Sequence, residues 1–270
     1  MKNFNRDFYE NNYFSNGSPV PYGLKSGEIT IYPVLVKDAL VYDYAKTILM
    51  IDKNKINDVN ILQMSDLEYL LNLCMQEEDI YSQFALIMYL CLHEEYVSIK
   101  DERGNLLRDN GKPVIAICDK EKRLKAKITS KEFNIIKKII LFQNDKDYDD
   151  TEYSADMQEQ INLWIEVQNR RSSSNHQPTM EEKKALLMSK NGMTEDKVNN
   201  LRLRLFEQMV QSVIDTDQYI GEMIIKGSYK YDVKDNIEYP IYREKKSIFE
   251  RAFVDRDKLS SKLGDSAKIG

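Results

Sequence analysis

The sequence predicts a mainly α-helical protein: a helical bundle-like domain with a small β-hairpin insertion, followed by a second helical hairpin domain. Two observations support this fold class. Hydrophobic residues make up 42% of the chain and charged residues 31%, with only ten glycines and six prolines in 270 residues, a balance typical of packed helices. Several long stretches also place apolar residues three and four positions apart, as one buried helical face requires.

Residues 1–27 are predicted to form an irregular, aromatic-rich arm, because "NGSPVPYGLKSG" contains two prolines and three glycines. The aromatic residues of this arm are too many for a purely solvated tail. We expect either the domain itself or a partner to cover them: Phe4, Phe8, Tyr9, Tyr13 and Phe14.

The helical domain is predicted to span residues 28–172. A short strand, "EITIYPV", and a helix, "VKDALVYDYAKTILMI", open it. One long helix, capped by Ser65 or Asp66, then runs through "LEYLLNLCMQEEDIYSQFALIMYLCLHEE". Cys91 and His93 in this helix are expected to pack in the core or at the helix end, because residues two apart face different directions and cannot share a zinc ion.

Residues 96–128 change from helical to strand patterning. The segments "YVSI" and "PVIAIC" are rich in β-branched residues and are separated by Arg-Gly and Asn-Gly turn signals, which predicts a hairpin, and "LKAKIT" is a candidate third strand. The glycines between them lack the order of a phosphate-binding loop. A solvated turn is therefore expected there.

The sequence Thr129-Ser-Lys-Glu132 is a capping box that opens the helix "KEFNIIKKIILFQ". Helical spacing resumes in "SADMQEQINLWIEVQNRR", and the polar stretch "RSSSNHQP" then predicts a linker. We place the main domain boundary in this linker, near Ser173.

The second helical hairpin is predicted at residues 179–225. Thr179 and Glu182 repeat the capping box, Asn191-Gly192 is typical of a left-handed helix end, and Thr194 caps a long second helix. Two helices joined by such a tight turn form a packed pair.

Residues 226–270 are polar and are expected to form a partly mobile or partner-bound tail. One short amphipathic piece surrounds Ile248, Phe249, Ala252 and Phe253. Since aromatic side chains and cations often anchor interfaces, we predict partner contacts at Lys245, Phe249, Arg251 and Phe253. The alternative is that this piece packs back on the preceding helix pair.

The stretch "QNDKDYDDTEYSAD" raises the question of a calcium loop, with Asp145, Asp147, Asp149 and Asp156 as ligands. The sixth position of such a loop needs glycine and the twelfth a long bidentate glutamate. Here they are Asp150 and the shorter Asp156. Acidic residues before a helix are also stabilised by its unpaired N–H groups. We therefore expect an acidic turn, with no metal and no cofactor.

The formal net charge of −5 and the pI near 5.4 argue against chain-wide binding to nucleic acid or to anionic membranes. No apolar run is long enough for a membrane span or a signal peptide. Cys74, Cys91 and Cys118 have no paired spacing and are expected to be free thiols, mostly buried, in a reducing cytoplasm.

The sequence gives only weak support for two further function classes, sequence-specific DNA binding and catalysis. "KNGMTEDKVNNLRLRLFEQMV" has a helix-turn-helix outline, but its Thr-Glu-Asp turn would repel the phosphates that a recognition helix approaches. No ordered set of nucleophile, base and acid stands out. We expect a non-enzymatic protein.

Three segments, in order, resemble tail-assembly proteins of bacteriophages that infect Gram-positive hosts: "ITSKEFNIIKKIILFQNDKDYDD", "PTMEEKKALLMSKNGMTEDKVNNLRLRLFEQMVQSV" and "YPIYREKKSIFERAFVD". The resemblance covers roughly residues 129–255, about half of the chain. The matching elements are Gln143-Asn144, Tyr148-Asp149-Asp150, Met180-Glu181-Glu182-Lys183, Gly192-Met193-Thr194 and Leu203-Arg204-Leu205-Phe206.

This resemblance implies a tail-assembly chaperone in the host cytoplasm that holds the tape-measure protein, the tail-tube protein or both while a tail is built. It also implies that the acidic turn belongs to the helical core. The resemblance is also compatible with a homo-oligomer. The alternative is a structural component of the virion, such as a neck or baseplate piece, and calcium binding or DNA binding is less favoured.

Overall fold

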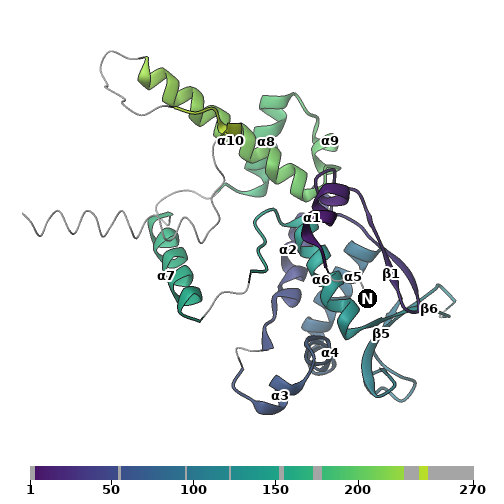
Figure 1. Ribbon diagram of the computed structural model, residues 1–270. Helices are drawn as coiled ribbons and strands as arrows, with labels where there is room; N and C mark the ends of the chain where they lie inside the picture. Colours follow the sequence, from purple (N-terminus) through teal and green to yellow (C-terminus); the bar gives the residue numbers. More distant parts are fainter. Residues whose placement is uncertain are drawn as a thin grey trace, which may run out of the picture. The chain divides into compact units, whose positions relative to one another are not determined.

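Figure 1 shows the computed structural model, which describes residues 4–53, 56–94, 96–121, 123–151, 155–172, 178–227 and 237–242. Helices predominate among these residues, accompanied by one two-stranded and one four-stranded sheet. The protein is thus mixed α/β with a helical majority, so the predicted fold class is confirmed only in outline. The chain divides into two compact units: Met1–Asp149 with Met193–Met209, and Asp150–Gly192 with Val210–Gly270.

The N-terminal arm has regular structure, and the prediction of an irregular arm over residues 1–27 is wrong. Helix α1 (Arg6–Tyr9) continues into a π-helical turn, η1 (Glu10–Phe14), and strand β1 (Val20–Leu24) forms an antiparallel hairpin with β2 (Gly27–Ile31). Pro21 is tolerated in β1 because both strands of a two-stranded sheet are edges, where a missing N–H is not needed. The strand within "EITIYPV" is confirmed as β2.

The larger sheet confirms the predicted hairpin and its third strand. It contains β3 (Val97–Ser98), β4 (Arg108–Asp109), β5 (Lys112–Cys118) and β6 (Leu124–Thr129), with β5 pairing antiparallel to each of the others. Asn110 and Gly111 between β4 and β5 both have positive φ, 50° and 76°. Two such residues in succession match the twist of a tight hairpin.

The helices of the first unit before this sheet are α2 (Ala39–Lys46), flanked by the 3₁₀ turns η2 (Val36–Asp38) and η3 (Thr47–Met50), then α3 (Val59–Gln63), α4 (Asp66–Gln76) and α5 (Glu78–Leu92). Ser65 caps α4, accepting a hydrogen bond from the Glu68 N–H. The predicted single helix from Ser65 is wrong, because Glu77 is extended and separates two helices. Acidic residues at the first turn of α5 favour a new helix start there.

Helix α6 (Ser130–Asn144) runs through the centre of the first unit. The Thr129–Glu132 capping box is present as predicted. The last four residues of the helix, from Leu141 to Asn144, are all buried, so the C-terminal turn of α6 is enclosed on every side. The core around it contains large side chains that are fully buried, including Tyr42, Leu67, Leu71, Phe84, Ile87, Met88, Phe133, Phe142 and Phe206.

Residues 193–209 complete the first unit from a distant part of the chain. Helix α9 (Glu195–Asn199) and helix α10 (Leu203–Lys226) replace the single helix predicted after Thr194. The two helices are separated at residues 200–202 because this segment pairs with residues 34–36. The Val36 N–H donates to the Leu201 carbonyl at 2.9 Å, and the Leu203 N–H donates to the Val34 carbonyl at 2.8 Å. The unit therefore extends beyond the predicted boundary near Ser173.

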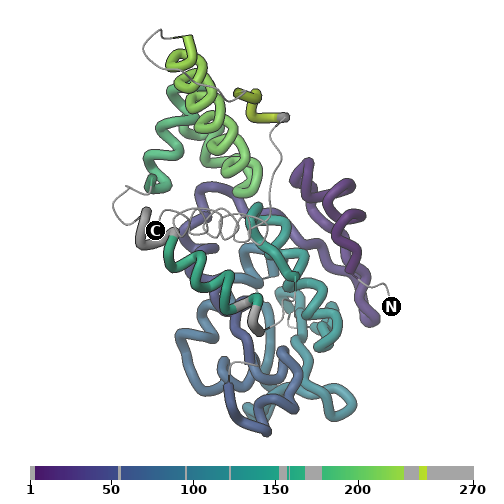
Figure 2. Tube along the Cα trace, turned by 60° about the vertical axis from the view of Figure 1, so that its left-hand side comes forward, coloured from purple at the N-terminus to yellow at the C-terminus, as the bar shows by residue number. Residues whose placement is uncertain are grey.

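The second unit contains α7 (Ala155–Ser172), α8 (Met180–Asn191), the second half of α10 and the 3₁₀ turn η5 (Pro240–Tyr242). The Thr179–Glu182 capping box and the left-handed Gly192, at φ 63°, confirm the predicted helix boundaries. Helix α8 lies alongside α10 (Figure 2), joined by an ion pair between Lys190 and Asp217. The centre of the predicted linker, residues 173–177, lies outside the described residues.

Candidate partner-binding surfaces

The four residues predicted to contact a partner, Lys245, Phe249, Arg251 and Phe253, lie outside the described residues. Their contacts are therefore a prediction from sequence alone. The described chain comes closest to them at η5, which ends at Tyr242.

The acidic stretch forms a turn at the end of α6. The Asp145 N–H bonds to the Leu141 carbonyl at 2.8 Å, and the Asp145 carboxylate accepts the Asp147 N–H at 3.0 Å. A second oxygen of Asp145 lies 3.8 Å from the Lys46 ammonium. Across the part of the chain that the structure describes, no three His, Cys, Asp or Glu side chains are placed to hold a metal; Asp156 lies in α7, and its side chain is outside that part.

Cys91 and His93 pack as predicted, in the core and at a helix end. His93 ends α5 in the left-handed conformation and stacks on Tyr32 with ring centroids 3.9 Å apart. Burial raises the pKa of the Cys91 thiol far above its ordinary value and raises that of Cys74 to about 12. Protonated, buried thiols of this kind are poor nucleophiles and poor metal ligands.

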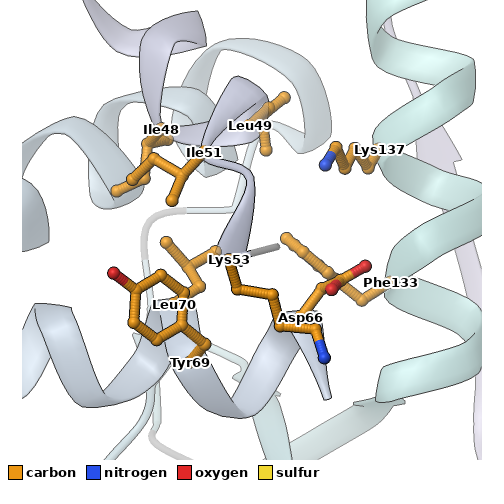
Figure 3. Close-up of a pocket in the computed structure, with 9 residues that line it drawn as sticks. All are labelled: Ile48, Leu49, Ile51, Lys53, Asp66, Tyr69, Leu70, Phe133 and Lys137. Atoms are coloured by element: carbon orange, nitrogen blue, oxygen red, sulfur yellow. The ribbon is translucent and has the colours of Figure 1, made fainter. Parts of the chain in front are cut away.

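A small cavity lies between α4, α6 and the segment after α2 (Figure 3). Its volume is about 10 Å³, roughly the space of one water, which is too little for a substrate. Burial lowers the pKa of Lys137 at its edge, an effect that Asp66 and Asp52 partly offset. The lining residues are Ile48, Leu49, Ile51, Lys53, Asp66, Tyr69, Leu70, Phe133 and Lys137.

Arg204 joins three distant segments beneath the N-terminal arm. Its Nη2 atom lies 2.9 and 3.0 Å from the two carboxylate oxygens of Glu10, and its Nη1 atom donates to the Phe142 carbonyl at 3.0 Å. The guanidinium also lies over the Phe14 ring. Charge-assisted hydrogen bonds between a guanidinium and a carboxylate position both partners. Arg204 therefore joins the arm to the C-terminal turn of α6 and to the first turn of α10.

The domain covers the aromatic side chains of the arm in part: Phe14 is buried, Phe4, Tyr9 and Tyr13 are half-buried, and Phe8 is 50% exposed. Phe4 stacks on Phe142 with ring centroids 5.5 Å apart, and the Arg6 guanidinium lies 4.6 Å from the centre of the same Phe142 ring. Gln143 donates from Nε2 to the Ser18 carbonyl at 2.9 Å. These contacts hold the arm on the C-terminal turn of α6.

The second half of α10 presents the clearest surface for a partner. Ile220 and Ile224 continue the helical stripe of the buried Phe206 and Val210, yet they are 49% and 69% exposed. Met223 beside them is also exposed. We call Ile220, Met223 and Ile224 the α10 apolar face.

Charged residues of both signs border this face. At about 100° of rotation per helical residue, Asp217 falls beside Ile224 on one edge, and on the other edge Lys226 lies nearer to Met223 than Asp215 or Glu222 does. Asp217 is paired with Lys190 of α8. The sequence pattern could have shown this face, since the three-four spacing extends into "YIGEMIIK", but only the structure shows that α8 leaves it uncovered.

Comparison with known protein families, with curated proteins and with solved structures gave no match. Among the described helices, none combines the length and the apolar character that crossing a bilayer requires.

Proposed function

We propose that this protein is a non-enzymatic tail-assembly chaperone of a bacteriophage of Gram-positive bacteria. It acts in the host cytoplasm and binds the tape-measure protein, the tail-tube protein or both during virion assembly. The resemblance over residues 129–255 supports the family, and the α10 apolar face is the structural observation that supports polypeptide binding.

The chemistry of the α10 apolar face suits a polypeptide partner. Contiguous exposed apolar side chains on a folded protein commonly mark an interaction site. An amphipathic partner helix can lay its apolar side on such a face, with apolar residues at helical spacing as anchors.

The test is co-purification with the tape-measure protein of the same phage after coexpression. Ile224→Asp places a charge at the most exposed residue of the face and is expected to weaken binding at least about ten-fold, the effect of losing an interface anchor. The matched control is Leu40→Asp in the first unit, because Leu40 is a similarly exposed aliphatic residue, 71% against 69% for Ile224.

Retention of the wild-type protein on the tape-measure protein, its loss in Ile224→Asp and its persistence in Leu40→Asp would support the proposal. Mass spectrometry of purified virions adds a second measurement, since a chaperone leaves the particle. Stoichiometric protein in the virion, or equal binding by both variants, would contradict the chaperone function proposed for this face.

A further inference from the structure

The sequence contains three Asn-Gly pairs, Asn16-Gly17, Asn110-Gly111 and Asn191-Gly192. Asparagine is a thermolabile residue, because the backbone nitrogen of the next residue can attack its side-chain carbon Cγ. A C–N bond then closes a five-membered succinimide ring, the bond from Cγ to Nδ2 breaks, and ammonia leaves with the proton of the backbone nitrogen. Water opens the ring to aspartate or isoaspartate. Glycine hinders the attack least because it has no Cβ.

The fold decides which pair reacts, since the attacking N–H must be free of hydrogen bonds, the carboxamide must be free to turn, and the backbone must be able to change its torsions. Asn16 meets none of these conditions. Its Oδ1 atom accepts the Ser18 N–H at 3.1 Å, and the Gly17 N–H donates to the Phe14 carbonyl at 3.2 Å. Gly17 is also buried against the Arg202 side chain.

Asn191 is restrained by its helix. It is the last residue of α8, and its backbone therefore has helical torsions. Its side chain is exposed, but the ring closes only after the last helical turn has opened. Local opening at a helix end is frequent, so we expect a slow reaction here.

Asn110-Gly111 is the least restrained of the three pairs. Both residues are exposed and have positive φ, 50° and 76°, as a two-residue hairpin turn requires. Among the described residues, none hydrogen-bonds to the Gly111 N–H or to the Asn110 carboxamide. In the same part of the chain, no atom beyond the neighbouring residues lies within 4 Å of the position that a Gly111 Cβ would take. Arg108 donates to the Gly111 carbonyl oxygen at 2.9 Å, which is not a reacting atom.

We propose that Asn110 is a site of spontaneous deamidation in the folded protein, with water as the only co-reactant. Asn110 reacts first, Asn191 more slowly, and Asn16 only when the N-terminal arm opens. This inference goes beyond the proposed function, because it needs no partner protein and its test uses the purified chain alone.

Conversion to isoaspartate inserts one extra carbon atom into the backbone of the turn. The two-residue connection sets the register of β4 and β5, in which Arg108 pairs with Pro113 and Asp109 with Lys112. These pairs are therefore lost first. Strand β5 keeps its pairing with β3 and β6, so the change stays local to the tip of the hairpin.

Incubation of the full-length protein in mildly alkaline buffer, followed by peptide mapping with mass spectrometry, tests the proposal. We expect the Asn110 peptide to convert at least about ten-fold faster than the Asn16 peptide, which reacts only after local opening, and faster than the Asn191 peptide. In guanidinium chloride the three pairs should react at similar rates, because the same dipeptide is then free at each position.

A pair of matched variants adds a second measurement, the release of ammonia. Asn110→Gln should remove the fast phase of this release, since glutamine would have to close a six-membered ring. Asn16→Gln is the control and should keep the fast phase.

Fastest conversion at Asn110 in the folded protein, together with similar rates in guanidinium chloride, supports the proposal. Equal rates in the folded protein would overturn it, and so would faster conversion at Asn16 or Asn191. A ranking that persists in guanidinium chloride would overturn it as well, since neighbouring residues and not the fold would then set the rates. If Asn110→Gln disturbs the turn, the peptide map of the wild-type protein decides the result.

Discussion

Cys74 and Cys91 are shielded by the packing of α4 and α5, whereas Cys118 at the end of β5 is partly exposed. The thiolate is the reactive form of cysteine, and burial raises the pKa of both helical thiols. At pH 8 these two thiols are therefore protonated as well as inaccessible. The three residues should differ sharply in reactivity.

We predict that a chromogenic disulfide reagent titrates one thiol of the native protein promptly at pH 8 and the other two only in denaturant. Cys118→Ser should remove the fast phase and leave the slow one, as followed by absorbance. Prompt reaction of two or three thiols in the folded protein would show that the α4–α5 pair opens readily.

Asn144 illustrates a role that local sequence does not reveal. Its Oδ1 atom accepts the Val34 N–H at 2.7 Å, and its Nδ2 atom donates to the Ile140 carbonyl at 2.9 Å. In the sequence, the Gln143-Asn144 pair stands out only as part of the resemblance to tail-assembly proteins. The physical reason for an asparagine is a buried backbone N–H more than a hundred residues away, which costs about 1–3 kcal/mol if left without an acceptor.

The capping boxes of α6 and α8 are the same local motif, but they lie in different tertiary surroundings. Glu132 and Glu182 each reach back to the cap residue, Thr129 or Thr179, at the start of their helices. Glu132 also accepts a hydrogen bond from a distant element: the Lys25 N–H in the β1–β2 turn, at 2.9 Å. Glu132 is buried, so its loss leaves two backbone donors without partners.

We predict that Glu132→Ala lowers the free energy of unfolding by about 2–4 kcal/mol, and that Glu182→Ala lowers it by about 0.5–1 kcal/mol. Urea denaturation followed by circular dichroism measures both. Equal losses would mean that the Lys25 contact contributes nothing, and that the β1–β2 hairpin is held by other interactions alone.

Helix starts were predictable because caps act over three or four residues, as at Ser65, Thr129, Thr179 and Thr194. Helix breaks were not. Continuous apolar spacing predicts one helix across Glu77 and another across Asn200–Arg202, yet both stretches are interrupted. The second break follows from pairing with residues 34–36, a long-range contact that no local pattern encodes.

At the scale of the whole molecule, the first unit depends on residues far beyond the predicted boundary. Residues 201–206 supply backbone hydrogen bonds to residues 34–36, the ion pair of Arg204 with Glu10 and the buried Phe206 side chain. Without them, the Val36 N–H and the Val34 carbonyl lose their partners and Phe142 loses part of its cover. The segment is a structural part of the unit.

We predict that a fragment of residues 1–172 does not fold cooperatively. A fragment of residues 1–227, which includes residues 193–209, is expected to fold cooperatively. Thermal melting followed by circular dichroism, together with dispersion of amide signals in NMR spectra, distinguishes the two. A sharp melting transition and dispersed spectrum for the shorter fragment would show that the boundary near Ser173 is a true domain boundary and that residues 193–209 are dispensable.

The sequence by itself determined the helical majority, the capped helix starts, the Asn-Gly hairpin and the left-handed end at Gly192. These features depend on side chains and backbone groups within a few positions of one another. Only the tertiary structure decided that the arm packs on α6, that residues 201–206 complete the first unit, and that Ile220 and Ile224 stay exposed while Phe206 and Val210 are buried. One apolar stripe continues along α10, and whether each turn is core or surface depends on which distant element lies against it.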